Sequence, residues 1–308
     1  MNNLQEKLQA HKKVAGIALE AISTELNISG AALCDGLNGK DNGVNEKMTE
    51  LVQQYLERDQ RRAQEISLIK KDFDFVETTI YKRISEGVEM ADLRGEIRVV
   101  IGESGVGKTR ALKHIEEFRM GSIYVAVYAG IRKSRFLSKL CDAAKIEAKG
   151  SCDDKFESLV RGLRGSGRLI MIDEVEHLSI EALDTLRSIN DCTGCGLILA
   201  GLPIFYNRLR TRQADYAYIY NRTSIPVITD LLKESDVAKL VTTILPDCCN
   251  VPVQVWFNAC GGIGRDLRMI VQESIRVAEV NSIQIGDTPR FTDMILAVRK
   301  ALGRQFTK

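Results

Sequence analysis

The sequence predicts an α/β protein whose parallel sheet carries a phosphate-binding loop, with helical segments before and after this core. A glycine-rich loop ending in Gly-Lys-Thr follows one short apolar run, and a second apolar run ends in Asp173-Glu174. Further apolar runs alternate with amphipathic segments along the middle of the chain. Short buried strands that alternate with helices are typical of a parallel sheet covered by helices.

Length and composition indicate the broad class. The chain has 308 residues, 44% of them hydrophobic and 27% charged, which suits a globular protein of two or three domains. The N-terminus is polar and no apolar run is long enough to cross a bilayer, so we expect a cytoplasmic protein. Its eight cysteines are then expected to be reduced thiols. Cys192 and Cys195 have the C-x-x-C spacing without a second such pair, which favours small buried hydrophobes over a zinc site.

Residues 1–65 predict an N-terminal helix-turn-helix domain. One helix ends near Leu26, Asn27 suits the left-handed turn, and Ser29 can cap a second helix. That second helix is poor in side chains that read bases. Its outward residues are Gly30, Ala31, Cys34 and Asp35. Two interpretations stay open: loose DNA binding, which we favour slightly, or contact with another protein.

A charge-rich stretch, residues 58–74, predicts a linker. Phe75-Val76-Glu77-Thr78 follows it and leads into an amphipathic helix that ends near Glu89. This helix lies directly before the apolar run of the phosphate loop, where we expect it to cover the adenine of a bound nucleotide.

The phosphate loop is the most specific motif in the chain. Gly102 to Thr109 reads G-x-x-x-x-G-K-T, between a predicted strand at Ile97–Ile101 and a predicted helix over residues 110–118. Glycines let backbone N–H groups point at phosphate oxygens, Lys108 reaches the β- and γ-phosphates, and Thr109 is a Mg²⁺ ligand. The alternative, a glycine-rich turn with a chance Lys-Thr, does not explain why motif and context agree. The residues expected to contact the nucleotide here are Gly102, Glu103, Ser104, Gly105, Val106, Gly107, Lys108, Thr109 and Arg110.

The second half of the core predicts the partner motif. Strands are expected at residues 123–128, 169–172 and 196–200, and helices over 135–144, 155–163 and 179–189. The middle strand ends in Asp173-Glu174, at the edge of the sheet where ligands of parallel sheets lie. Asp173 is expected to bind both the nucleotide and Mg²⁺, the metal mostly through water, and Glu174 to orient and deprotonate the attacking water. Asp-Glu after an apolar run is a weak signal alone, and a strong one at this distance after a phosphate loop.

Domain boundaries follow from these patterns. We place an ATPase core at residues 66–228. From about Asp230 only helical patterns remain, which predicts a small C-terminal helical domain over residues 229–308.

Together these segments resemble the AAA+ ATPases, and within them the transposition-helper branch. The resemblance covers nearly the whole chain, and both nucleotide motifs are common to all AAA+ proteins. The narrower resemblance is carried by the helix-turn-helix with Leu37-Asn38, the lead-in Phe75-Val76-Glu77-Thr78 and the helical C-terminus with Leu267-Arg268. It implies a P-loop AAA+ sheet core, ATP and Mg²⁺ as cofactors, and slow ATP hydrolysis that DNA and a partner stimulate.

The resemblance also implies a function. A protein of this branch binds double-stranded DNA largely without sequence preference, self-associates into an ATP-dependent helical filament or ring, and delivers target DNA to a transposase. A bacteriophage-encoded member would act in the host cytoplasm. Two alternatives stay open: a helicase loader of the same superfamily, and an ATP-switched helix-turn-helix transcription regulator.

The resemblance further implies roles for two arginines. Arg222, within Tyr220-Asn221-Arg222-Thr223, takes the place of the catalytic arginine finger that reaches the γ-phosphate of a neighbouring subunit; a plain surface arginine is the alternative. Arg268 takes the place of a second, nucleotide-contacting sensor, against an ordinary ion pair on a helix surface. At the first sensor the chain departs from the pattern, since Leu202-Pro203 replaces a polar residue. The rivals to Arg222 are Arg208, Arg210 and Arg212.

A basic segment predicts the DNA contact. Between residues 119 and 168 basic side chains clearly outnumber acidic ones. Arg132, Lys133 and Arg135 follow the second strand, and Arg164 is expected to contribute from a neighbouring loop. Such contacts bind phosphates without reading sequence. Solvated helix faces are the alternative explanation for the same residues.

Overall fold

The computed structural model describes residues 24, 50, 53–58, 74–211, 216–245, 250–283 and 288–302. The chain divides into two compact units, Met1–Asp72 and Phe73–Lys308. In the first unit residues 53–58 are helical, and Tyr55 and Leu56 are buried. The rest of the predicted helix-turn-helix, and most of the predicted linker, lie outside the described residues.

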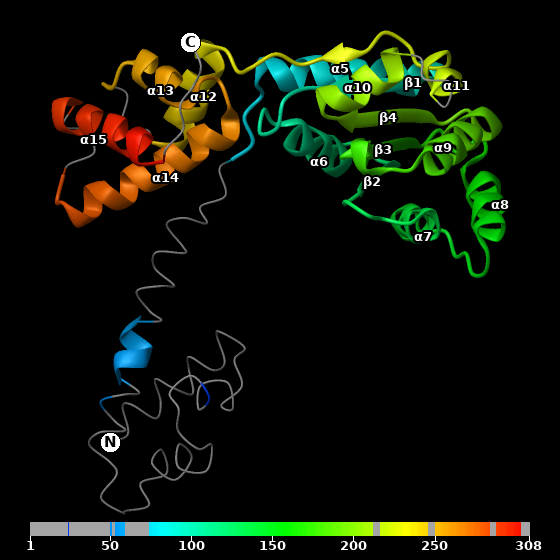
Figure 1. Cartoon of the computed structure of the whole chain (residues 1–308), viewed down its shortest axis with the longest axis horizontal. Helices are drawn as coiled ribbons and strands as arrows, with labels where there is room; N and C mark the ends of the chain where they lie inside the picture. Colours follow the sequence, from blue (N-terminus) through cyan, green and yellow to red (C-terminus); the bar gives the residue numbers. More distant parts are fainter. Residues whose placement is uncertain are drawn as a thin grey trace, which may run out of the picture. The chain divides into compact units, whose positions relative to one another are not determined.

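Five parallel strands form the centre of the second unit, in the order β2-β3-β4-β1-β5 (Figure 1). Their bounds are β1 (Ile97–Ile101), β2 (Ser122–Ala126), β3 (Leu169–Asp173), β4 (Gly196–Gly201) and β5 (Val227–Ile228). All residues of β3 and β4 are buried, as expected for central strands that helices cover on both faces. The predicted α/β fold with a parallel sheet is therefore confirmed.

Helices cover both faces of this sheet. Their bounds are α5 (Thr79–Arg94), α6 (Lys108–Phe118), α7 (Lys133–Ala144), α8 (Cys152–Leu163), α9 (Ile180–Thr193), α10 (Pro203–Arg210) and α11 (Ala217–Tyr220), with a short turn η1 (Val175–His177). Alternate strand residues belong to two separate apolar cores. Val100 and Ala200 pack in the core that includes α5 and α6, whereas Val99 and Leu199 pack in the core that includes α7 and α9.

Four elements of the core were not predicted from the sequence: η1, α10, α11 and β5. Strand β5 has two residues, which is too short for a periodic pattern. Helix α10 begins at Pro203, two residues after the end of β4, and proline suits that first helical position. Helix α5 runs past its expected end near Glu89 and stops at Gly95, which has φ 62°.

A further group of helices follows the sheet: α12 (Glu234–Ile244), α13 (Val253–Cys260), α14 (Gly264–Val280) and α15 (Thr288–Ala301). Trp256 and Phe291 are buried within this group, with their ring centroids 6.1 Å apart. Their apolar core is continuous with that of α5 and α6. The group and the sheet therefore share one of the two cores.

Asp236 joins this group to α5. Its buried carboxylate accepts hydrogen bonds from the N–H of Thr79 at 2.8 Å, the hydroxyl of Thr79 at 2.6 Å and the N–H of Lys233 at 3.2 Å. Thr79 begins α5 and Lys233 is the N-cap of α12, so one carboxylate lies at the positive ends of two helices. These donors replace the water that a buried charge gives up.

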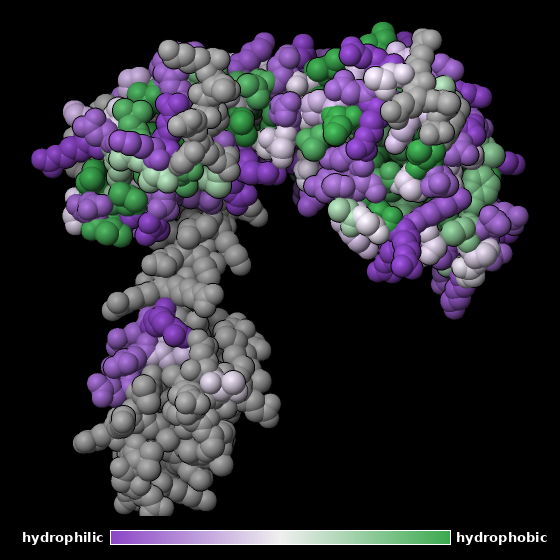
Figure 2. All heavy atoms as spheres, viewed as in Figure 1, coloured by the Kyte–Doolittle hydropathy of each residue, from purple (hydrophilic) through white to green (hydrophobic). Residues whose placement is uncertain are grey.

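The visible surface of the second unit is mainly hydrophilic, with hydrophobic side chains in smaller patches (Figure 2). The most exposed large apolar side chains include Leu93, Phe118 and Met120, at or just beyond the ends of α5 and α6. None of the helices in the described part of the chain combines the length and apolar character that a membrane crossing requires.

Candidate nucleotide site

The phosphate loop and the Asp-Glu motif meet at the carboxyl edge of the sheet. The loop begins at Gly102, directly after β1, and Asp173 is the last residue of β3. Strand β4 lies between β1 and β3, so two strand spacings, about 10 Å, separate the two strand ends. Ligands of parallel sheets lie outside this edge. The fold therefore assembles both predicted motifs into one candidate site.

Two glycines shape the backbone of the loop. Gly105 and Gly107 have φ of 83° and 114°, a region that residues with side chains avoid. Gly107 is the N-cap of α6 and makes no side-chain hydrogen bond, so no side chain competes for the N–H groups in the first turn of that helix. These N–H groups and the positive end of α6 form an anion site that fits a nucleotide phosphate.

Lys108 is buried at the base of the loop, with 8% of its surface exposed. Its Nζ donates to the carbonyl oxygens of Gly102 at 2.7 Å and Glu103 at 2.9 Å. Burial lowers the pKa of Lys108, while the negative charges of Asp173 and Glu176 act in the opposite direction. A bound phosphate would add negative charge beside this ammonium group and favour its charged form.

Asp173 is oriented by hydrogen bonds to both of its carboxylate oxygens. Oδ1 accepts from the backbone N–H of Glu174 at 3.0 Å, and Oδ2 accepts from the hydroxyl of Tyr124 at 2.9 Å. Tyr124 lies on the neighbouring strand β2, in register with Met171. Burial, and then the charge of Asp173, raises the pKa of Tyr124, which keeps its hydroxyl protonated as a donor. Tyr124 was not predicted as a site residue, because only the sheet order brings it beside Asp173.

The two glutamates after Asp173 lie in different environments. Glu174 is exposed and has φ 60°, a left-handed conformation that is uncommon for a residue with a side chain. Glu176 is half-buried in η1, and its Oε2 accepts from the N–H of Leu202 at 3.2 Å. Leu202 stands at the end of β4, where the resemblance places a polar sensor. The polar group at that point is the carboxylate of Glu176, which was not predicted.

The residues of the site suit a Mg²⁺ ion that is held through a nucleotide. Within the described ranges, no cluster of three or more His, Cys, Asp or Glu is arranged to hold a metal ion by itself. Thr109 is exposed in the first turn of α6, and Asp173 lies across the site on β3. Mg²⁺ at such sites takes one or two protein oxygens and completes its shell with phosphate oxygens and water. Thr109 and Asp173 fit this pattern. Cys192 and Cys195 are free thiols. Cys195 is buried as predicted, whereas Cys192 is exposed, so the prediction of a buried hydrophobe is wrong for Cys192.

An arginine of α14 lies against the phosphate loop. The N–H of Arg265 donates to the carbonyl of Gly105 at 3.0 Å, and its Nη1 donates to the hydroxyl of Ser104 at 3.3 Å. Arg268, the predicted second sensor, lies further along the same helix and is half-buried. Arg265 was not predicted, because only the fold brings the start of α14 to the loop. Its positive charge contributes to lowering the pKa of Lys108, after the larger effect of burial.

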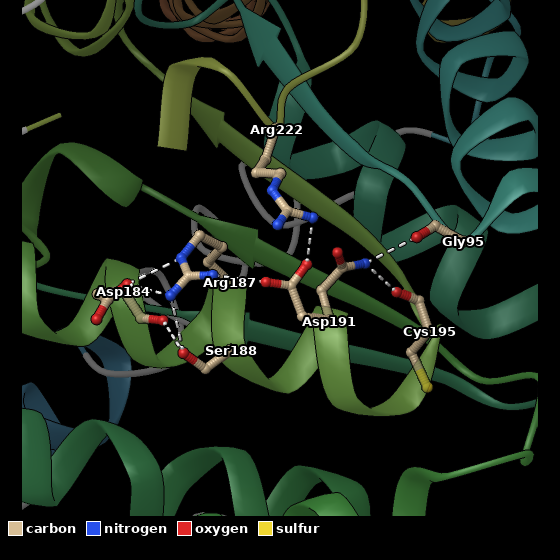
Figure 3. Close-up of polar contacts among 8 residues, drawn as sticks. Gly95, Asp184, Arg187, Ser188, Asp191, Cys195 and Arg222 are labelled. Carbon is tan, nitrogen blue, oxygen red and sulfur yellow. Dashed lines mark hydrogen bonds and ion pairs between the residues drawn. The ribbon is translucent and has the colours of Figure 1, made fainter. Parts of the chain in front are cut away.

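Arg222 lies at the opposite, amino edge of the sheet. The next residue, Thr223, bridges to Ile97 at the start of β1, and the N–H of Ser224 donates to the carbonyl of Ile97 at 2.9 Å. The length of β1, roughly 16 Å for its five residues, separates this point from the phosphate loop. An arginine side chain is too short to span that distance. Arg222 is 58% exposed, and its Nη1 pairs with Oδ1 of Asp191 at 2.9 Å (Figure 3).

The predicted rivals to Arg222 follow β4 in the chain. Arg208 and Arg210 are exposed on α10, and Arg212 lies outside the described residues. Arg110, predicted as a nucleotide contact, is exposed in the first turn of α6.

The residues predicted to bind DNA lie at both the carboxyl and the amino edge of the sheet. Arg132 is the N-cap of α7, and Lys133 and Arg135 lie in its first turn, on the carboxyl side of β2. Arg132 and Arg135 are exposed, and Lys133 is half-buried. Arg164 lies between α8 and the start of β3, at the amino edge, where its Nε donates to the carbonyl of Cys192 at 3.3 Å. The structure therefore groups three of these residues and separates Arg164 from them.

The chain is similar to known proteins, both in the region of the two nucleotide motifs and over most of its length. Residues 92–209, which include the phosphate loop and Asp173, match the family described as "AAA domain". Over 228 residues the chain is 29% identical to "ATP-dependent target DNA activator B" of Escherichia phage Mu, across 70% of this chain and 69% of that protein. It is 26% identical over 241 residues to "Mu-like prophage FluMu DNA transposition protein B" of Haemophilus influenzae, across 76% of this chain and 82% of that protein.

Solved structures share the fold. The ORC2 protein of Aeropyrum pernix has a TM-score of 0.57 and 14% identity, over 78% of this chain and 72% of that one. The CDC6P protein of Pyrobaculum aerophilum has a TM-score of 0.53 and 14% identity, over 70% of this chain and 66% of that one. At this level of identity the likeness concerns the fold alone.

Proposed function

Because the chain is an AAA+ ATPase of the Mu B type, we propose that it binds target DNA in an ATP-dependent manner and delivers that DNA to a transposase. The observation that carries this proposal is a phosphate loop and an Asp173 carboxylate assembled at one sheet edge, in a chain 29% identical to an ATP-dependent target DNA activator. A helix-turn-helix domain at residues 1–65 and a helical domain at residues 229–308 belong to the same proposal.

ATP is hydrolysed between the phosphate loop and β3. The loop N–H groups and the ammonium group of Lys108 bind phosphate oxygens. Thr109 and Asp173 would hold Mg²⁺, which would supply positive charge that offsets the charge of the phosphates. Glu174 accepts a proton from the attacking water. Its exposure supports this role, because a base must be accessible to the water that it orients.

Arg222 acts on the nucleotide of a neighbouring subunit. Its exposure and its position at the amino edge, a strand length from its own phosphate loop, support a role in trans. A guanidinium placed beside the γ-phosphate stabilises charge that develops during phosphoryl transfer. Hydrolysis therefore depends on assembly, and DNA stimulates hydrolysis by gathering subunits into a filament or ring.

Duplex DNA contacts the start of α7. Arg132 and Arg135 are exposed there, and the first turn of α7 contains no acidic residue. The positive end of the helix adds to the charge of these side chains. Contacts of this kind bind phosphates and not base edges, so the binding is largely independent of sequence.

Electron microscopy of the protein with random-sequence duplex DNA tests the proposal. With ATP we expect regular assemblies along the DNA, and without ATP, or with Lys108→Ala, we expect bare DNA. Lys239→Ala, an exposed lysine on α12, is the matched control and should assemble normally. Binding to one sequence only would favour the transcription regulator instead. Co-purification with a helicase and not with a transposase would favour the helicase loader.

A further inference from the structure

A row of charged side chains runs along α9 and ends at Arg222 (Figure 3). Asp184, Arg187 and Asp191 lie three and four residues apart, so they share one face of the helix. Nη2 of Arg187 lies 2.8 Å from Oδ1 of Asp184, and its Nη1 lies 2.5 Å from Oδ2 of Asp191. The other oxygen of Asp191, Oδ1, lies 2.9 Å from Nη1 of Arg222. Asp191 therefore contacts one arginine with each oxygen.

Both sides of the contact between Asp191 and Arg222 are fixed to the amino edge of the sheet. Asn190 is buried, and its side-chain amide donates to the carbonyl of Gly95 at 2.9 Å and to the carbonyl of Cys195 at 2.7 Å. These two carbonyls lie just before β1 and β4. The backbone after Arg222 is held on the first residue of β1. The ion pair thus joins two segments whose backbones are already placed by other contacts.

The helix itself disfavours a carboxylate at position 191. Asp191 lies in the last turn of α9, where the carboxyl end of a helix carries partial negative charge. No basic residue of α9 lies in that turn. The compensating charges come from Arg187, one turn earlier, and from Arg222 on a separate segment. Asp191 is therefore stable in this place because two arginines reach it.

We propose that Asp191 is a positioning residue for Arg222, holding its guanidinium at the amino edge in the orientation that meets the γ-phosphate of a second copy. The inference rests on the proposed role of Arg222 in trans. A guanidinium has five N–H donors in a rigid fork, and Asp191 takes up one Nη. The other donors are then available to a phosphate. An arginine that is already held also loses less conformational freedom when it binds. Arg187 supports this arrangement, because it fixes the orientation of the Asp191 carboxylate.

Asp191→Asn tests the proposal, because it removes the charge and keeps the size of the side chain. We expect kcat of DNA-stimulated hydrolysis to fall about tenfold, as when one such interaction is missing from the transition state. Nucleotide affinity in a direct titration should not change, since the phosphate loop of the same chain lies at the opposite edge. Asp191→Glu keeps the charge and should recover part of the rate. Asp142→Asn is the matched control, because Asp142 is an exposed aspartate in the last turn of α7 that does not pair with Arg222.

Mixing experiments separate a positioning role from damage to the whole protein. Asp191→Asn mixed with Glu174→Gln should recover activity, because one subunit brings an intact base and the other an intact finger. Loss of activity without recovery on mixing would place the defect in the variant's own site and overturn the proposal. Faster hydrolysis by Asp191→Asn alone would mean that Asp191 keeps Arg222 away from the neighbouring nucleotide. An unchanged rate would mean that Asp191 does not position Arg222. Either result would overturn the proposal.

Arg222→Ala is measured in parallel, so that the two proposals can fail separately. Normal hydrolysis by Arg222→Ala would show that Arg222 is not the arginine finger. An inactive Arg222→Ala beside a fully active Asp191→Asn would refute only the inference about Asp191.

Discussion

The charged side chains at the carboxyl edge of the sheet make different kinds of contact from those at the amino edge. At the carboxyl edge the charged groups of Lys108 and Asp173 are buried and bond to backbone groups or to Tyr124. At the amino edge Arg222 is 58% exposed and Asp191 is 27% exposed, and they bond to each other. A buried charge needs partners from its own chain, whereas an exposed pair can add a partner from outside. On the proposals above, one chain supplies the groups that bind the nucleotide at its carboxyl edge, and Arg222 at the amino edge of a second copy meets that nucleotide.

The largest effect is expected at the carboxyl edge, from Glu174→Gln. The substitution keeps the shape of the side chain and removes the base, so ATP hydrolysis should fall roughly a hundredfold to ten-thousandfold. ATP should still bind, and assemblies on DNA should last longer. Phosphate release and a nucleotide titration measure the two effects. Glu176→Gln is the comparison and should lower the rate of ATP hydrolysis less, because Glu176 accepts a hydrogen bond from the N–H of Leu202. A larger loss for Glu176→Gln would transfer the role of base to Glu176.

Lys108→Ala should weaken nucleotide binding by roughly tenfold to a hundredfold, the value of a hydrogen bond to a charged group. The reason is that this ammonium group is buried at the base of the loop, where the proposal places the phosphates. Isothermal titration with ATP measures the affinity, with Lys239→Ala as the control. If Lys108→Ala binds ATP as the unchanged protein does, the nucleotide does not occupy this edge and the contrast between the edges fails.

A triple variant with alanine at Arg132, Lys133 and Arg135 sharpens the comparison for DNA. Binding should weaken equally on all sequences, and the dependence of log affinity on log salt should flatten by about 0.9 for each phosphate that the variant leaves without a basic side chain. Salt titrations on two unrelated duplexes measure both. Lys239→Ala, on α12, is the control and should leave the slope unchanged. An unchanged slope for the triple variant, with binding abolished by removal of residues 1–65, would place the DNA site in the predicted helix-turn-helix.

The smallest effect is expected from Tyr124→Phe. Loss of the hydroxyl that orients Asp173 should raise the Mg²⁺ concentration for half-maximal hydrolysis about fivefold, the value of one ordinary hydrogen bond. Tyr128→Phe is the matched control, because Tyr128 is exposed and its ring lies 5.1 Å from Nζ of Lys139. Equal Mg²⁺ dependence in both variants would show that the backbone N–H of Glu174 is sufficient to orient Asp173.

The carboxyl edge was predictable because its main motifs are contiguous in the sequence. The run from Gly102 to Thr109 and the pair Asp173-Glu174 each lie within a few residues, so local spacing carries the chemistry. Strand β1 occurs at its predicted bounds, because a short apolar run before a glycine loop has few other structures available. The contacts that refine the site were not predictable. Tyr124 lies 49 residues from Asp173, and Arg265 lies 161 residues from Ser104, so sheet order and helix packing bring them together.

The amino edge was predicted less completely for the same physical reason. The resemblance assigned Arg222, yet no local pattern links it to Asp191, 31 residues earlier. Strand β5, which begins four residues after Thr223, is also too short to be recognised before its neighbour β1 is known. Pairing between distant segments decides this edge, and such pairing depends on the whole fold.

Asp236 has a consequence for how the second unit unfolds. Its carboxylate binds the first residue of α5 and the N-cap of α12, and the helices on both sides of it share one apolar core. If α12–α15 detached by themselves, they would leave Thr79 without its acceptor and expose that shared core to water. The sheet and the helical group are therefore expected to melt in a single cooperative calorimetric transition. Heat would separate the two parts only by unfolding both of them.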